Sequence, residues 1–193
     1  MISSEPNGAE LILEIEGDGL DRALAMLDGI PAGVERAVGS AVKRAAAHGA
    51  TIGARLAQER YVIGPNTLKR FLHHYNQSLN GGLAWKFGYW GYKIPLIQYD
   101  TSLDSKGRVR TRVLRTSARE VLNRAFISTG QSYNRVRERI GSKRYPTREL
   151  YGPSAVSAIT LNEDKVETAV QEEFDKRIGH EIMRILNELG GGA

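Results

Sequence analysis

The sequence VETAVQEEFDKRIGHEIMRILNEL (residues 166–189) carries an apolar side chain at nearly every third or fourth position. This spacing places the apolar side chains on one face of a helix of about six turns. The stripe consists of Val166, Val170, Phe174, Ile178, Ile182, Ile185 and Leu189. Thr160 followed by Glu163 predicts a capping box, and the glycines from residue 190 supply a stop. We therefore predict an amphipathic C-terminal helix over 160–189 that docks on a sheet or, in part, on a neighbouring chain.

We predict helices over 20–61, after a strand or arm in residues 1–19. The spacing of Leu20, Leu24 and Leu27 predicts a short helix, and a second apolar stripe predicts a long one. Its members are Val34, Val38, Ala41, Ala45, Ile52 and Leu56. This segment is rich in alanine and glycine. Gly39, Gly49 and Gly53 would each cost about 1 kcal/mol relative to alanine in an isolated helix. We therefore expect close packing of this helix against another element or subunit.

Residues 83–127 have the pattern of a sheet. In RVRTRVLR (108–115), valine and threonine alternate with Arg108, Arg110 and Arg112. The two sets face opposite sides of a strand, which is typical of an antiparallel sheet with one solvated or partner-bound side. Pro95 favours an edge or a bulge. The predicted fold class is α+β in a single domain over 1–193, with a central antiparallel sheet bracketed by the Ala/Gly-rich helix and the C-terminal helix.

A basic loop and a proline corner are predicted over 128–159, around SKRYPTRELYGPSA (142–155). Each proline restricts the residue before it to extended or turn conformations, and glycine at 152 tolerates backbone angles that other residues resist. We expect a rigid corner that sets the angle of the C-terminal helix, with its tyrosines packed beneath it. The corner residues are Tyr145, Pro146, Tyr151, Gly152, Pro153 and Ser154.

The composition narrows the possible chemistry. Without cysteine there are no disulfides, no thiol catalysis and no cysteine-based metal sites, which fits synthesis in a reducing cytoplasm. There is no apolar run of about 20 residues, so we expect no transmembrane helix and no membrane partner. The first residues lack the features of a secretory signal.

No known catalytic constellation is present. His73 and His74 are adjacent, so on a helix they would point about 100° apart and could not share a metal as an i, i+4 pair does. Ser154 has no histidine or lysine base nearby in sequence. We expect no catalytic, cofactor-binding or metal site, and no enzyme, although a carboxylate pair on the C-terminal helix and an unrecognised hydrolase stay open.

The net charge of +5 is unevenly distributed. Residues 106–148 contain many arginines and lysines and only two acids, whereas the C-terminal stretch is rich in acids. This asymmetry favours head-to-tail pairing between copies or a polyanion partner, besides the simpler interpretation of a solubilising surface. The candidate partner- or DNA-contact residues are Arg108, Arg110, Arg112, Arg135, Arg137, Arg139, Lys143, Arg144 and Arg148. No sequence-specific recognition motif accompanies them, although aromatic residues 89–99 offer stacking platforms.

The C-terminal third also carries a family resemblance. It contains Ala-Phe-Ile at 125–127, Arg-Tyr-Pro at 144–146 and Leu-Tyr-Gly-Pro-Ser at 150–154, followed by a long helix. This pattern resembles the prophage minor tail protein Z family, the tail-completion proteins of long-tailed phages. The chain departs from the family in its aromatic-rich segment 82–102. It also has Ala-Val-Ser-Ala-Ile after the Gly-Pro-Ser turn, where Val-Pro-Gln is expected.

The resemblance implies a structural virion protein at the head-proximal, neck end of a phage tail, assembled in the host cytoplasm. Such a protein completes the tail beside the tail terminator ring and makes it competent for head–tail joining. The implied partners are other copies in a ring of about six, the tail terminator, and tail tube or head-connector proteins, with no cofactor. The alternative is a basic module that contacts nucleic acid non-specifically through its arginine-rich middle. The surroundings of the arginines distinguish the two.

Overall fold

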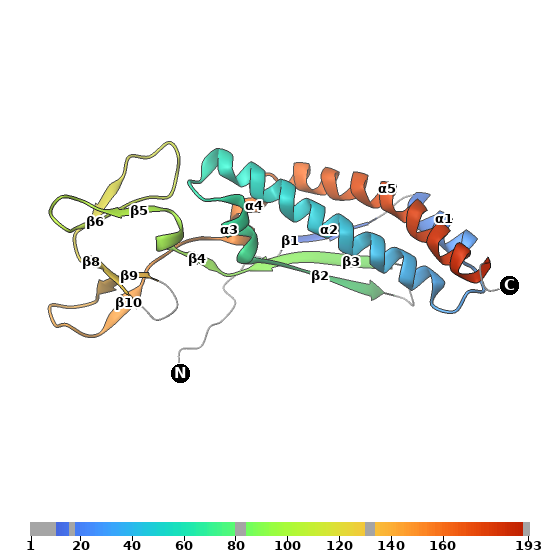
Figure 1. The fold of residues 1–193 in the computed structure, drawn as a ribbon, viewed down its shortest axis with the longest axis horizontal. Helices are drawn as coiled ribbons and strands as arrows, with labels where there is room; N and C mark the ends of the chain where they lie inside the picture. Colours follow the sequence, from blue (N-terminus) through green and yellow to red (C-terminus); the bar gives the residue numbers. More distant parts are fainter. Residues whose placement is uncertain (1–10, 16–17, 80–83, 130–133, 191–193) are drawn as a thin grey trace. The chain divides into compact units, whose positions relative to one another are not determined.

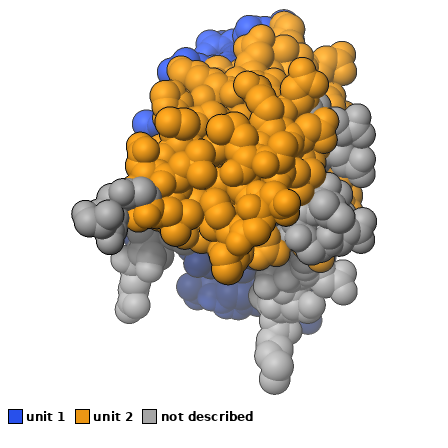
Figure 2. All heavy atoms as spheres, turned by 90° about the vertical axis from the view of Figure 1, so that its right-hand side faces the viewer, with its two compact units in different colours: residues 1–9, 54–72, 91–161 blue, residues 10–53, 73–90, 162–193 orange. Residues whose placement is uncertain are grey.

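The computed structural model describes residues 11–15, 18–79, 84–129 and 134–190. These residues form two compact units, which Figure 2 shows in different colours. Unit 1 contains the described residues of 54–72 and 91–161, and unit 2 contains those of 10–53, 73–90 and 162–193. The sequence predicts a single domain over 1–193. The described residues form two compact units, and each has its own buried core.

Unit 2 combines a small sheet with helices. Its elements are β1 (Leu11–Glu14), α1 (Asp18–Met26), the first part of α2 (Gly33–Arg60), β2 (Leu72–Leu79), β3 (Ala84–Gly91) and α5 (Glu163–Gly190). The sheet has the order β1-β3-β2, and β1 pairs with β3 in antiparallel fashion. The three helices lie on the same face of this sheet (Figure 1).

The two predicted apolar stripes meet in the core of unit 2. All members of the α5 stripe are buried except Leu189. On α2, Val38, Ala41 and Ala45 are buried, whereas Val34, Ile52 and Leu56 are partly exposed. A Cβ atom at Gly49 would overlap the side chains of Val170 and Tyr89. The close packing expected of this small-residue helix is therefore confirmed, since only glycine fits at this position.

Polar contacts also join α2 to β3 and to α5. The Tyr89 hydroxyl on β3 donates a 2.6 Å hydrogen bond to the Ala46 carbonyl of α2. Arg44 lies 3.3 Å from Glu181, which is only 4 % exposed although the other acids of α5 lie mostly on its outer faces. Glu181 also pairs with Arg184 at 2.9 Å. A buried carboxylate is stabilised here by two guanidinium groups, as burial of a charge requires.

The C-terminal helix differs from its prediction at its start. Residues 155–160 form a separate short helix, α4 (Ala155–Thr160), and α5 begins at Glu163. Thr160 donates from its hydroxyl to the Val156 carbonyl within α4. The predicted capping box is therefore wrong, because Thr160 closes one helix instead of starting the next.

Unit 1 is built mainly from short antiparallel strands. Its elements are α3 (Pro65–Arg70), β4 (Lys93–Pro95), η2 (Leu96–Gln98), β5 (Asp100–Leu103), β6 (Val109–Arg112), β7 (Glu120–Leu122), β8 (Ala125–Ser128), β9 (Arg135–Arg139), β10 (Thr147–Glu149), β11 (Tyr151–Ser154) and α4. They form the sheets β5-β6-β7, β10-β9-β8 and β11-β4. Pro95 lies on a strand with a single partner, as expected of an edge.

The α+β class, with one long helix before and one after the strands of unit 1, is confirmed. The strands are divided among four small sheets in the described part of the chain. The predicted loop over 128–159 is wrong in part, because β9, β10 and β11 lie within it. Val136 is the one fully buried side chain of β9. The apolar alternation there is consequently too weak to reveal a strand.

Candidate protein-contact site

Strand β6 has the two faces expected from its sequence. Val109 and Thr111 are buried, and Arg110 and Arg112 are partly exposed. The hydroxyl of Thr111 lies 3.0 Å from that of Thr101 on the neighbouring strand β5. The predicted strand with arginine on one side is therefore confirmed.

Two arginines of this region are held by carboxylates of unit 1. Arg108 Nη2 lies 2.8 Å from Asp104 Oδ2, and Arg112 Nη2 lies 2.9 Å from Asp100 Oδ2. Arg119 also donates to both oxygens of Asp100, at 2.7 and 3.0 Å. The hydrogen bonds from Arg119, with the charges of both arginines, hold the pKa of Asp100 below its usual value. Carboxylates of unit 1 therefore partly neutralise the charges of these arginines.

The arginines of strands β9 and β10 also have partners. Arg137 donates from Nε to the hydroxyl of Thr147 at 3.0 Å. Arg148 Nη2 lies 2.8 Å from Glu138 Oε2, which stands opposite it in the register of the two strands. Cross-strand pairs of opposite charge stabilise such sheets modestly. These arginines therefore stabilise their own sheet through contacts between its strands.

Three further basic residues have other surroundings. Arg135 Nη1 lies 3.8 Å from Glu149, and the Arg139 guanidinium sits 4.9 Å from the ring centroid of Phe126. Arg110 Nε is buried and has no hydrogen-bond partner among the described residues. The predicted contact residues are thus not one set of free cations.

Sequence reasoning missed the compensating acids. Asp100, Asp104 and Glu149 lie just outside the basic stretch 106–148, so a count within that stretch omits them. The hairpin of β5 and β6 places Asp100 opposite Arg112. Pairing the two strands around the 104–107 turn would have predicted this contact.

The basic residues at 143 and 144 lie in a different setting, the 140–146 loop between β9 and β10. Every residue of this loop is exposed. Among the described residues no carboxylate lies within 4 Å of Lys143 or Arg144, and Arg144 stacks 5.7 Å from the Tyr145 ring centroid. Ile140 and Tyr145 are 57 % and 67 % exposed. The loop therefore presents two cations beside two large apolar side chains.

The proline corner at the base of this loop is held by a buried aromatic ring. A Cβ atom at Gly152 would lie 2.6 Å from Cε2 of Tyr99 and 2.8 Å from its Cζ. Tyr99 is 6 % exposed, and its hydroxyl donates to the Pro153 carbonyl at 3.4 Å. Burial raises the pKa of Tyr99 above its usual value. Only glycine allows the chain to pass so close to this ring.

The end of the corner is a helix cap. Ser154 Oγ accepts a 3.1 Å hydrogen bond from the Ser157 N–H, so Ser154 is the N-cap of α4. Tyr145-Pro146 is a cis peptide. The corner leads directly into α4, whereas α5 begins only at Glu163. Its predicted role in setting the angle of the long helix stays a prediction.

The two tyrosines of the corner do not pack beneath it, contrary to the prediction. Tyr145 and Tyr151 are 67 % and 48 % exposed. The ring that fills this space is Tyr99, which lies more than fifty residues before Gly152 in the sequence. Local spacing could not reveal such a long-range contact.

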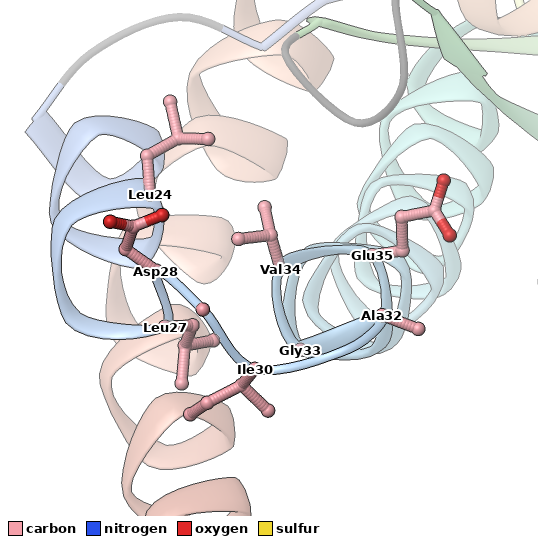
Figure 3. A pocket seen from close by; sticks show the side chains of 9 residues that line it. Leu24, Leu27, Asp28, Ile30, Ala32, Gly33, Val34 and Glu35 are labelled. Carbon is pink, nitrogen blue, oxygen red and sulfur yellow. The ribbon is translucent and has the colours of Figure 1, made fainter.

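Shallow depressions lie among the described residues of each unit. One in unit 1, of about 520 Å³, is lined by Gln58, Tyr99, Asp100 and the arginines 112, 115 and 119. One in unit 2, of about 400 Å³, lies between α1 and α2. Figure 3 shows that its lining combines Leu24 and Val34 with the carboxylates of Asp28 and Glu35. Neither depression brings a nucleophile together with a base.

His73 and His74 both lie close to other side chains of unit 2. His73 stacks on Trp90 with ring centroids 4.4 Å apart. The pKa of His74 is lowered by partial burial, then by the charges of Lys43 and His73. Within the described ranges no group of three metal-ligating side chains is found. The same ranges contain no helix with the length and apolarity needed to span a membrane.

Comparisons with protein-family models, curated proteins and solved structures find no match for this chain.

Proposed function

We propose that the chain is a structural virion protein of a phage tail, which completes the head-proximal end and prepares it for head–tail joining. The resemblance of residues 125–154 to tail-completion proteins supports this role. The features of unit 1 are compatible with it, because short strands and a helix cap hold a loop that is exposed along its whole length.

The observation that carries the proposal is that arginines on or next to strands β6 and β10 pair with carboxylates. Arg108, Arg112 and Arg148 each pair with a carboxylate of their own unit. A surface built for a polyanion would leave such cations available for phosphate groups. Arginines that already pair with carboxylates fit the polar rim of a protein interface better than they fit a phosphate-binding surface.

The proposed partners are further copies of the chain, the tail terminator, and tail tube or head-connector proteins. The symmetry of a tail favours a closed ring, and six copies would match a six-fold tube. We propose that the chain assembles on these components at the neck of the virion.

The test is binding to tail components. Purified protein is mixed with isolated tails or with tail terminator, and the masses of the free and mixed samples are compared. The proposal predicts a complex of defined stoichiometry at micromolar concentration. A chain that stays free in both mixtures would count against the role.

A second candidate is non-specific contact with phage DNA, and one observation favours it. Lys143 and Arg144 have no carboxylate partner among the described residues. Two phosphate contacts predict binding whose affinity falls with salt with a slope of about −2 in log units. Titration of labelled duplex at several salt concentrations measures this slope, and a slope near zero excludes the contact.

A further inference from the structure

The 140–146 loop exposes basic and large apolar side chains together. Ile140 and Tyr145 expose more than half of their side chains, and Lys143 and Arg144 lie between them. The loop is closed at its base by a hydrogen bond from the Ile140 N–H to the Pro146 carbonyl, at 3.2 Å. It is therefore presented in a defined position and not as a loose end.

A surface of complementary charge lies on α5. Asp164, Glu167 and Glu172 are exposed, and none has a basic partner within 4 Å among the described residues. Together with Thr168, Gln171 and Asp175 they line a shallow depression of about 410 Å³ along one side of the helix. We call these six residues the α5 acidic face. Lys165 lies at the edge of this face and lines the adjoining depression.

The two surfaces match in size. From Asp164 to Asp175 the helix rises about 16 Å, at 1.5 Å per residue. The loop is carried by two paired strands about 5 Å apart, so its tip, with side chains, is on the order of 10 Å wide. One loop can therefore lie along the face and place Lys143 and Arg144 among its carboxylates, with Tyr145 against the aliphatic parts of these side chains.

We propose that the 140–146 loop of one copy docks on the α5 acidic face of a second copy. The contact is heterologous, because two different surfaces meet, and repetition therefore generates a ring or an open chain of copies. This inference deepens the proposed function and rests on it for the ring in which the contact is repeated.

The contact should be weak in isolation. A seven-residue loop buries less than the roughly 1,200 Å² of a stable interface. We expect pairs with a dissociation constant on the order of 0.1–1 mM at low salt, weakened further as salt screens the charges. Assembly on a tail would raise the effective concentration of neighbouring copies and make the same contact stable.

The test is sedimentation of the purified full chain between about 10 µM and 1 mM, at low and at high salt. Reversal of the loop in Lys143→Glu/Arg144→Glu should weaken self-association at least tenfold. Reversal of the face in Glu167→Lys/Glu172→Lys should do the same. An equimolar mixture of the two variants should recover association to within about threefold of the original chain, because each kind of surface again finds its opposite.

A matched control separates specific docking from net charge. Lys93→Glu/Lys106→Glu makes the same change in charge at exposed lysines elsewhere in unit 1, and it should associate like the original chain. The inference is overturned if the original chain is monomeric up to about 1 mM at low salt, or if the mixture fails to recover. It is also overturned if loop reversal abolishes DNA binding and leaves self-association unchanged.

Failure of this test is distinguishable from failure of the proposed function. Sedimentation needs no tail component, whereas the proposed function is tested by binding to tails. A chain that joins tails normally after loop reversal would retain its proposed role and lose the proposed contact.

Discussion

The close approach of Gly152 to Tyr99 makes a sharp prediction for Gly152→Ala. The new Cβ would lie 2.6 Å from Cε2 of a ring that is only 6 % exposed. Carbon atoms in contact prefer about 3.5–4.0 Å, so the ring or the corner must move by about 1 Å. The buried ring has little free space, and its hydroxyl contact with the Pro153 carbonyl would be strained as well.

Overpacking of this kind typically costs about 1–3 kcal/mol. For a chain of this size each kilocalorie lowers Tm by roughly 2–4 °C, so we expect a loss of about 2–12 °C. Thermal and urea unfolding, followed by circular dichroism, measure the change. The matched control is Gly141→Ala, since a Cβ there meets nothing within 4 Å. It should stay within about 0.5 kcal/mol of the original chain.

A double-mutant cycle identifies the cause. In a Tyr99→Leu background the ring is gone, and Gly152→Ala should then cost less than about 0.5 kcal/mol. The reasoning is refuted if Gly152→Ala unfolds like the original chain, or if its penalty is the same with and without the ring. At the level of function, Gly152-Pro153→Ala-Ala should impair tail joining.

Three further predictions test other parts of the structure. Ser154→Ala removes the cap of α4 and should cost about 1 kcal/mol in urea unfolding, with rescue by Ser154→Asp. Gly49→Ala overlaps Val170 and should cost about 1–3 kcal/mol, whereas Gly179→Ala, with nothing within 4 Å, should be neutral or stabilising; equal effects would contradict the packing. The Arg119 hydrogen bonds lower the pKa of Asp100 from its usual 3.8. The contribution of Asp100 to the free energy of unfolding is therefore complete above about pH 4 and is lost as the pH falls further. Asp100→Asn should flatten the pH dependence of unfolding below about pH 4, and an unchanged profile would contradict the pairing.

The parts of the fold that sequence predicts are those with long periodicity. The α5 stripe repeats over many turns, so one buried face follows from spacing alone. Strand β6 was also predictable, since arginine alternates there with valine and threonine. The short strands β9 and β10 were not, because charged residues occupy most of their positions and three to five residues give little periodicity. The capping box failed because a turn at 161–162 separates two helices, and a capping pattern cannot report such a turn.

The candidate site was predictable in composition but not in contacts. The basic residues and the corner could be identified from the sequence. The contact of Tyr99 with Gly152 joins residues far apart in the chain, and the pairing of Asp100 with Arg112 and Arg119 depends on strand register. Both arise from tertiary structure, so local spacing carries no signal for the first and only a hairpin alignment predicts the second.

The most direct test of the proposed role is electron microscopy of assembled tails, with the chain tagged or deleted. The account predicts density for this chain at the head-proximal end, in a closed ring with the symmetry of the tail, and tails without the chain that do not join heads. A complete tail that lacks the chain and joins heads normally would contradict it.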